Sequence, residues 1–445
     1  MTAREFWKGK RVAIIGLGPH GEMAEDAESM IKAGAWVSIY DLKSEARLKS
    51  QLIFLRSEGL ANYVCGSIPA DDLPDNDLII LSHEYPRDSS FLKAVLEKGV
   101  PVEYPETFFF KKAPPVTVIG VMGDSGKSTV VSMLSPMLES ICKAEGQGFF
   151  VIDPESGEGI ISKLKKAKNG DLVLMRITGE MMRELHSIRI SPQVAVFTTV
   201  PGPGCYDSSP FEILEFQTYN NFIIASDEVI DATRRYKDLP RAKMLRTKAS
   251  IIPPEWDLPN LSGGAQSHNR ENAALVLQAA RLFKVDDELA HRLLAKWKPL
   301  PGRLQAIKKV KGVGFYNDSA SVNPNSTIRA LELLSSEDPQ KNVILVLGGA
   351  DGSHDYRLLY PALADRVGTI VLLPGSGTAK ERQRLHALEG IQVISAPSIE
   401  EAARLAMENA KKGDRVLFSP GFPAIGLAAS RKERGERFVK AVRSL

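Results

Sequence analysis

The sequence predicts an α/β protein of three domains, each built around a mainly parallel sheet. Two apolar strands, at 11–16 and 116–121, each run into a glycine-rich turn and then a helix-like stretch. Short apolar strands continue to alternate with helix-like segments as far as the C-terminus. The length of 445 residues is about three times that of a typical domain. These observations together favour three successive α/β units.

The expected domains cover residues 1–112, 113–298 and 299–445. A polar, proline-rich joint, KKAPP, separates the first two, and a second proline-rich stretch precedes the third. In the first domain we expect strands at 11–16, 36–41, 77–82 and 100–105, and in the second at 116–121, 171–177 and 194–200. In the third we expect GVGFYND, NVILVLGG, TIVLLPG, QVISAP and RVLFSPG.

Composition excludes several classes of protein. The 57 Lys and Arg nearly balance the 54 Asp and Glu, so no basic stripe marks a nucleic-acid surface. We see neither a signal-peptide pattern nor an apolar run near the ~20 residues that span a bilayer. Cys65, Cys142 and Cys205 are widely spaced and are expected to be free or buried thiols of a reducing compartment. We therefore expect a cytoplasmic protein with no membrane and no nucleic-acid partner.

The first glycine loop is Gly16-Leu-Gly18-Pro-His-Gly21, and it fits G-x-G-x-x-G between a strand and a helix. Backbone N–H groups at the start of such a helix can face an anion. Asp41 ends the next strand, where a carboxylate can meet a ribose or a base. This predicts a Rossmann-like nucleotide site, although a tight turn without a ligand remains an alternative.

The second loop runs from Gly120 to Thr129 and contains Gly123-Asp-Ser-Gly126-Lys127-Ser128-Thr129. It departs from the strict P-loop pattern because Val121 stands where the first glycine belongs. Its glycines still leave room for phosphate oxygens beside the backbone amides, Lys127 can reach the outer phosphates, and Ser128 could hold Mg²⁺. The central domain is therefore predicted to be P-loop ATPase-like.

Two such loops opening successive domains, followed by a third, Rossmann-like α/β domain, resemble the Mur ligase family and its D-glutamate-adding branch. The resemblance rests on both loops together with several segments in a fixed order along the chain. These segments are HNREN at 268–272, PGR at 301–303, NDS at 317–319, LGG at 347–349, SPG at 419–421 and RG at 434–435.

The resemblance implies an ATP-dependent amide ligase of peptidoglycan precursor synthesis that uses ATP and Mg²⁺. ATP would phosphorylate a carboxylate on a UDP-linked sugar, and an amino acid would attack the acyl phosphate. Lys127 is the implied catalytic residue, and Ser128 the implied metal ligand. The implied ATP-binding set is Gly123, Gly126, Lys127, Ser128 and Thr129, with Asn269 and Asn272 at the adenine, Arg303 at the phosphates and Asp318 at the ribose. The UDP end is assigned to Gly16, Gly18, Gly21 and Asp41.

The central domain departs from the family pattern where metal is held. The family's metal-binding Glu falls at or next to Arg176, and a cation cannot ligate Mg²⁺. The position of the family's Asn is Thr199, and the following loop has no His, with Asp207 its nearest carboxylate. The family's carbamylated Lys falls near Glu215. We therefore predict that a second, substrate-side metal site is absent and that Arg176 occupies its place as a fixed cation.

The third domain departs as well, at positions that the family uses for the incoming glutamate. Ala320 follows Asp318-Ser319 where the family has Lys, and the expected Lys, Ser and Phe fall near Gly352, Ala424 and Arg431. The candidates to replace them are Lys380, Arg382, Arg431 and His354, and solvated surface charges are the simpler interpretation of each.

Three other functions remain open on the sequence, and one of them, folate-type polyglutamation, is possible by analogy with the family. A nucleotide-binding pseudo-ligase would keep the fold and the ATP loop but act by binding a partner or a UDP-sugar. A nicotinamide dehydrogenase would use the first loop but leaves the GKST loop unexplained, so it ranks last.

Overall fold

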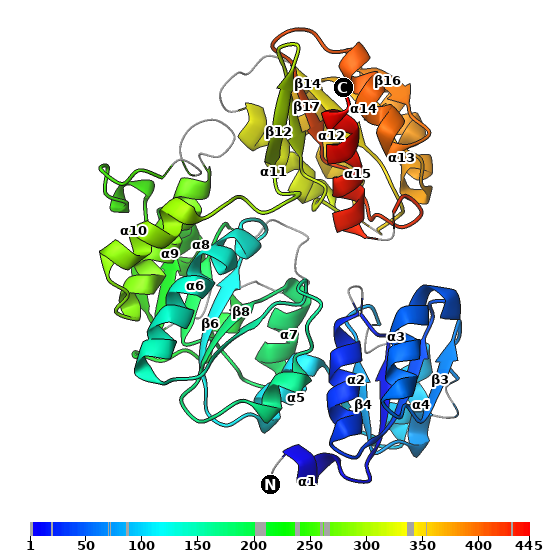
Figure 1. Ribbon diagram of the computed structural model, residues 1–445, viewed down its shortest axis with the longest axis vertical. Coiled ribbons are helices and arrows are strands. Elements are labelled where there is room, and N and C mark those ends of the chain that lie inside the picture. The colour runs from blue at the N-terminus through cyan, green and yellow to red at the C-terminus, as the bar shows by residue number, and fades with distance from the viewer. Residues whose placement is uncertain are drawn as a thin grey trace. The chain divides into compact units, whose positions relative to one another are not determined.

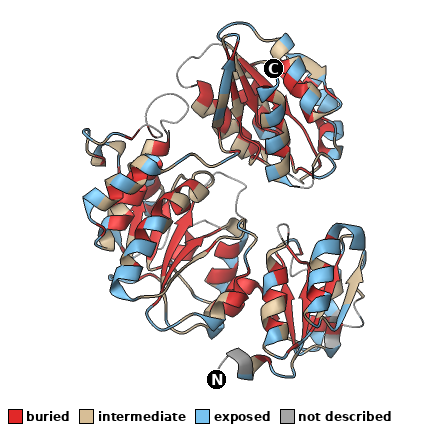
Figure 2. Ribbon diagram, viewed as in Figure 1, coloured by how far each residue is buried: buried red, intermediate tan, exposed pale blue. Residues whose placement is uncertain are grey.

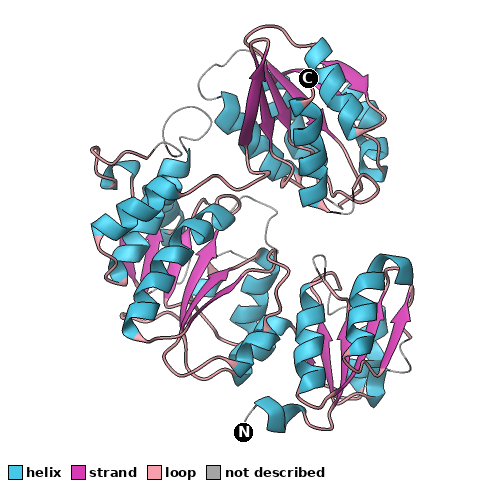
Figure 3. Ribbon diagram, viewed as in Figure 1, coloured by secondary structure: helices cyan, strands magenta, loops and turns pink. Residues whose placement is uncertain are grey.

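The computed structural model describes residues 3–18, 21–69, 71, 73–85, 89–200, 211–235, 241–258, 261, 268–335, 342–352, 354–428 and 430–445. The chain divides into two compact units, which we describe separately: Met1–Gly123 with Leu134–Thr247 and Gln278–Asp286, and Asp124–Met133 with Lys248–Leu277 and Asp287–Leu445. The described residues form three sheets, each flanked by helices (Figure 3). Every sheet draws its strands from one predicted domain range, but the units cross those ranges, so the boundaries stay a prediction.

The first sheet has five parallel strands in the order β3-β2-β1-β4-β5 (Figure 1). Its strands are β1 (Arg11–Ile15), β2 (Trp36–Asp41), β3 (Asn62–Cys65), β4 (Leu78–Leu81) and β5 (Val102–Glu103). The helices of this part are α1 (Ala3–Trp7), α2 (Glu22–Lys32), α3 (Glu45–Ser57), α4 (Lys93–Glu97) and α5 (Pro105–Lys112). The expected strands are present, and β3 is an edge strand that we did not predict.

The central sheet has six parallel strands in the order β11-β10-β9-β6-β8-β7. Its strands are β6 (Thr117–Met122), β7 (Phe149–Ile152), β8 (Leu172–Arg176), β9 (Val194–Phe197), β10 (Phe222–Ala225) and β11 (Lys243–Arg246). The helices of this stretch of chain are α6 (Lys127–Glu145), α7 (Gly179–Ser187), α8 (Asp227–Arg234), α9 (His268–Leu282) and α10 (Asp287–Lys296).

The third sheet has six strands in the order β12-β13-β17-β14-β15-β16. Its strands are β12 (Gln305–Val310), β13 (Val313–Asn317), β14 (Val343–Leu347), β15 (Val367–Leu372), β16 (Gln392–Ser395) and β17 (Arg415–Phe418). Its helices are α11 (Pro324–Ser335), α12 (Leu359–Arg366), α13 (Ser376–His386), α14 (Ile399–Glu408) and α15 (Arg431–Arg443). Only β12 runs antiparallel, because a two-residue turn at Lys311 and Gly312, both with positive φ, joins it to β13.

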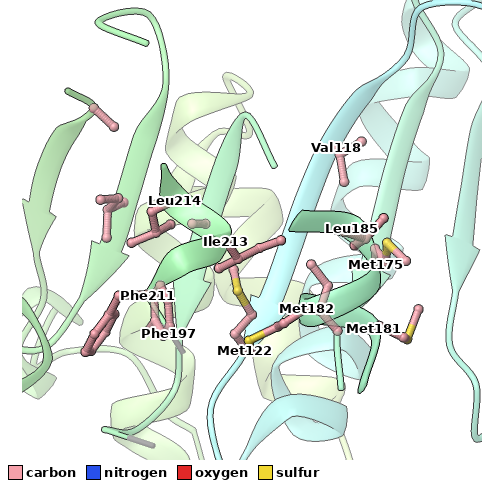
Figure 4. Close-up of a cluster of buried hydrophobic side chains, with 14 of the residues drawn as sticks. Val118, Met122, Met175, Met181, Met182, Leu185, Phe197, Phe211, Ile213 and Leu214 are labelled. Carbon is pink, nitrogen blue, oxygen red and sulfur yellow. The ribbon is translucent and has the colours of Figure 1, made fainter. Parts of the chain in front are cut away.

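The cores lie between these sheets and their helices, and the strands are the most buried elements (Figure 2). Every residue of β4, β8, β9 and β14 is buried, as expected for parallel strands covered on both faces. On one face of the central sheet, side chains of β6 and β8 pack against α7 (Figure 4). The labelled members of this cluster include Met122, Met175, Met181, Met182 and Leu185. Apolar packing therefore fixes the strands, and leaves their ends to carry polar residues.

The sequence predicts that the protein has no membrane partner and that its cysteines are free or buried thiols. Among the described residues, no helix has the length and apolar composition needed to span a membrane. Cys65 is partly exposed and Cys142 is buried, and both are free thiols. Cys205 lies outside the described residues.

Candidate functional site

The strand order marks one position in each of the first two sheets where a ligand is expected. In the first sheet the chain moves outward from β1 to β3 and then returns to β4 on the other side of β1. In the central sheet the connection from β6 leads to β7, whereas that from β8 leads past β6 to β9. Open α/β sheets bind ligands beyond the carboxyl ends of strands where the direction reverses in this way. These positions lie between β1 and β4, and between β6 and β8.

The first glycine loop follows β1 at its reversal point. Gly16, Gly18 and Gly21 have φ of 81°, 81° and 79°, a conformation that other residues rarely adopt. A Cβ on Gly16 would lie 2.2 Å from the ring of Tyr85, so the loop also needs glycine for space. The sequence prediction of a tight loop opening α2 is confirmed in its geometry, while its ligand stays a prediction.

Asp41 lies at the end of β2, but its carboxylate points inward and has no exposed surface. It accepts hydrogen bonds from Leu17 N at 2.9 Å, Lys43 N at 2.8 Å and the Tyr85 hydroxyl at 3.0 Å. Asp41 therefore holds the first loop against the next strand. The predicted contact between Asp41 and a ligand would require these internal bonds to be exchanged.

The second loop follows β6 at the reversal point of the central sheet. Gly123 and Gly126 have φ of 125° and 85°. A Cβ on Gly123 would lie 2.4 Å from Thr198 Oγ1, so this glycine passes close to the end of β9. Lys127 begins α6, and its Nζ donates to the carbonyl of Asp124 at 3.2 Å, back across the loop. Strand, glycine loop and helix thus follow one another as a phosphate-binding loop requires.

Ser128 and Arg303 come together, although 175 residues separate them. The Arg303 guanidinium donates to Ser128 Oγ at 2.8 Å. Nearby, Trp297 Nε1 donates to Ser132 Oγ at 3.0 Å, so the start of α6 is bonded to the segment before the third sheet. The predicted metal ligand, Ser128, and the predicted phosphate-binding residue, Arg303, therefore lie within hydrogen-bond distance of each other.

Asp318 follows β13 and is largely buried. Its carboxylate accepts from Leu304 N at 3.0 Å, from Ser419 Oγ at 2.8 Å and from the Ser321 hydroxyl. Burial raises the pKa of Asp318 to about 6, and these hydrogen bonds lower it only in part. Its predicted ribose contact is untested, and its present partners organise the ends of β13 and β17.

The other predicted ATP-binding residues lie at helix starts. Asn269 and Asn272 occupy the first turns of α9, and both are buried. Thr129, in the first turn of α6, is buried as well. Burial of polar side chains at these places is compatible with adenine and phosphate contacts, which stay predictions.

Arg176 ends β8 directly beside β6, since it pairs in register with Val121. Its guanidinium is buried and donates to Glu155 Oε1 at 2.5 Å and to Asp153 Oδ1 at 3.4 Å. Arg176 Nε is buried without a hydrogen-bond partner. Arg176 therefore lies at the reversal point, where two carboxylates that follow β7 hold it, while its predicted role as a fixed cation in place of a metal stays a prediction.

Metal-binding groups are scarce in the described part of the chain, which has no group of three or more His, Cys, Asp or Glu placed to hold an ion. Gly204 and Asp207, in the loop where the family's His is missing, lie outside the described residues. Glu215, at the carbamylated-lysine position, pairs with His186 at 2.6 Å. On α13, Lys380 forms an ion pair with Asp351.

One pair of residues escaped the sequence analysis. His83 follows β4, at the reversal point of the first sheet, and its Nε2 lies 2.7 Å from Oε1 of the buried Glu106. Its ring stacks on that of Tyr104, with centroids 4.3 Å apart and planes 7° apart. His83 and Glu106 belong to no sequence motif. The one sequence signal for His83 is its position directly after a predicted strand.

Residues 302–422 match the Mur ligase glutamate ligase domain. UDP-N-acetylmuramoylalanine–D-glutamate ligase of Koribacter versatilis is 27% identical over 98% of this chain and 98% of its own length. The ligase of that name from Streptococcus pyogenes serotype M4 is 27% identical, with coverage of 97% and 96%. These matches show that the chain is similar to Mur ligases over nearly its whole length.

Solved structures of Mur ligases share the fold of this chain. The UDP-N-acetylmuramate–alanine ligase of Thermotoga maritima superposes with a TM-score of 0.58 at 15% identity, covering 98% of this chain and 99% of its own. The murein peptide ligase of Psychrobacter arcticus gives 0.57 at 13% identity, with coverage of 98% and 99%. The predicted resemblance and the α/β fold class are confirmed.

Proposed function

We propose that this chain is an ATP-dependent amide ligase that adds an amino acid to a UDP-linked carboxylate in peptidoglycan precursor synthesis, as its D-glutamate ligase relatives are named to do. The observation that carries the proposal is the GDSGKST loop at the β6–β8 reversal, with Arg303 donating to Ser128. Phosphoryl transfer depends mainly on positioning and on charge neutralisation, and this arrangement offers both.

The reaction transfers the γ-phosphoryl group of ATP to a substrate carboxylate and leaves ADP and an acyl phosphate. The amine then attacks the acyl carbon, the C–O bond to phosphate breaks, and an amide and phosphate remain. In this chain the loop amides and Lys127 would bind the β- and γ-phosphates. Arg303 would hold the same phosphates from the segment before β12. The first glycine loop would anchor the UDP end of the substrate.

The described residues fit one Mg²⁺ and not two. Ser128 Oγ has two acceptor lone pairs, and the bond from Arg303 uses only one, so the hydroxyl can still meet a cation. Mg²⁺ also takes oxygens from the nucleotide phosphates, where it would offset their negative charge. At Arg176 a guanidinium stands in place of an oxygen ligand. We therefore propose one metal, at Ser128, and a fixed cation at Arg176.

Phosphate release tests the proposal, with purified protein, Mg-ATP, UDP-N-acetylmuramoyl-L-alanine and a panel of amino acids. Ligase function predicts phosphate release that needs both the UDP-sugar and one of the amino acids. Calorimetry tests the loop assignment separately: ADP should bind the wild type, and Lys127→Ala should bind it more weakly. Equal binding by Lys127→Ala, or no nucleotide binding at millimolar concentration, contradicts the assignment.

The pseudo-ligase is the second candidate, and the pairing of Arg176 with Asp153 and Glu155 favours it. Those carboxylates already compensate the guanidinium, which leaves less positive charge for an acyl phosphate. Nucleotide and UDP-sugar binding without phosphate release, for every amino acid in the panel, would support this function.

A further inference from the structure

The His83 segment lies against the first glycine loop. Ser82 N donates to the carbonyl of Ile15, the residue before Gly16, at 2.9 Å. Two residues after His83, the Tyr85 hydroxyl donates to Asp41, which itself holds the loop. A Cβ on Gly16 would meet both Ser82, at 3.1 Å, and Tyr85, at 2.2 Å. His83 therefore sits beside the loop on the β4 side of the reversal point.

The imidazole of His83 has a fixed orientation. Nε2 is bonded to Glu106, whose side chain is 1% exposed, and Tyr104 stacks under the ring. The His83 side chain remains 26% exposed. A buried carboxylate that holds one nitrogen of a partly exposed imidazole leaves the other nitrogen to meet a ligand, as in many binding and catalytic sites. Nδ1 is the nitrogen left in this way.

The charges around His83 favour its protonated form. Burial lowers the pKa of His83, but the carboxylates of Glu106 on α5 and of Glu180 and Glu184 on α7 outweigh it, and the pKa is raised. Arg183 is the cation in this group, and it is 3.6 Å from Glu184. The imidazole is therefore a charged donor over more of the neutral range than an ordinary histidine.

The described residues of the loop and of its neighbouring strand ends offer little free positive charge. The Glu22 carboxylate lies over Gly18 at the start of α2, where a Cβ on the glycine would be 2.2 Å from it. Lys43 bonds to the Gly18 carbonyl and pairs with Glu84 at 2.7 Å. Among the described residues beside this loop, His83 is the one on the β4 side that can present a positive charge to an anionic ligand.

We propose that His83 donates from Nδ1 to the diphosphate of a nucleoside diphosphate held at the first glycine loop, with Glu106 as the residue that positions its ring. This rests on the proposed function in one respect, namely that the first loop holds the UDP end of the substrate. It adds the side chain and the ligand group that meet there. A phosphate oxygen accepts a charge-assisted hydrogen bond from the imidazolium, with no proton transferred.

Calorimetry of UDP and uridine binding to the full-length protein tests the proposal. His83→Gln should weaken UDP binding about tenfold to a hundredfold, the loss expected for one charge-assisted hydrogen bond, and leave uridine binding unchanged. His186→Gln is the matched control, because His186 also pairs with a glutamate, Glu215, at 2.6 Å and stacks on Phe216. The control should bind UDP as the wild type does.

The pH dependence distinguishes a binding role from a structural one. Wild-type affinity for UDP should fall as pH rises through the His83 pKa, and His83→Gln should lack that step. Glu106→Gln should move the step to lower pH, because it removes the carboxylate that favours the imidazolium. In labelled wild-type protein, NMR titration should show that UDP raises the His83 pKa, that uridine does not, and that His186 is unaffected.

Two results would overturn the proposal. Unchanged UDP affinity in His83→Gln, or an equal loss for UDP and uridine, would remove the diphosphate contact while the first-loop assignment stands. Absence of UDP binding by the wild type would instead remove that assignment and this proposal with it. If His83→Gln does not fold, an unmoved His83 resonance on UDP addition to the wild type is sufficient to refute the contact.

Discussion

Arg434 offers the sharpest test of how the third sheet is held together. It lies on α15 and is fully buried. Its guanidinium donates to Phe422 O at 2.7 Å and to Ser319 O at 2.8 Å, with a longer bond to Ser321 O. These carbonyls belong to the chain after β17 and after β13. One side chain therefore ties together the two loops that surround Asp318.

The loss in the free energy of unfolding expected on replacing Arg434 follows from those hydrogen bonds. A hydrogen bond to a charged group contributes about 1.5–3 kcal/mol, so two short bonds give about 3–6 kcal/mol. Arg434→Met removes them and leaves buried carbonyls without donors, but it also removes the cost of desolvating the guanidinium, which lowers the pKa of Arg434 to about 10. We expect a net loss near the lower figure, about 3 kcal/mol. Arg434→Lys should lose roughly half as much, because one ammonium reaches one loop at a time.

Native-state hydrogen exchange measures this loss of stability at the loops that Arg434 joins. The Asp318 amide, bonded to Phe418 O at 2.8 Å between β13 and β17, is the reporter. Its opening free energy should fall by about 3 kcal/mol in Arg434→Met. Arg404→Met is the control, since Arg404 is half-exposed and pairs only with surface glutamates, and it should change stability by less than about 1 kcal/mol. Equal protection in the Arg434 and Arg404 variants would refute the reasoning.

Three further predictions concern the first unit. Arg176→Glu would place a third carboxylate beside Asp153 and Glu155, so Mg²⁺ should raise the thermal stability of this variant more than that of the wild type. Ligation that appears only in the variant would support the prediction that the wild type lacks the second metal site. Turnover of the wild type that depends on two metal ions and is abolished in the variant would contradict this prediction. Burial raises the pKa of Asp26 to about 7, so the folded protein holds a proton that the unfolded chain loses near pH 4. The free energy of unfolding should therefore fall as pH rises from about 4 to 7, and denaturant titrations of Asp26→Asn should lack this slope. Gly159→Ala should destabilise the protein where Gly159 packs on Asp26, because the alanine Cβ would lie 2.3 Å from Asp26 Oδ1, and wild-type stability in this variant would contradict that packing.

Much of the fold is visible in the sequence because its causes are local. Continuous apolar runs mark β1, β4, β6, β8, β14 and β17, and both glycine loops stand out because only glycine adopts their backbone angles readily. The two loops, the segments after them and their order were enough to predict the Mur ligase family. The short strands β3, β7, β10 and β11, and the antiparallel β12, were missed.

The sequence by itself determined the fold class, the phosphate-type loop and the presence of a cation at Arg176, since each depends on residue type and on neighbours along the chain. Only the tertiary structure decided how the polar side chains are used. It turned Asp41 inward, paired Arg176 with Asp153 and Glu155, and oriented His83 on Glu106. These partners stand 21 to 24 residues apart for each bond cited, and Arg303 and Ser128 are 175 apart. Contacts of this kind arise when separate strand ends meet at one edge of a sheet, and no periodicity along the chain records which side chains will face each other there.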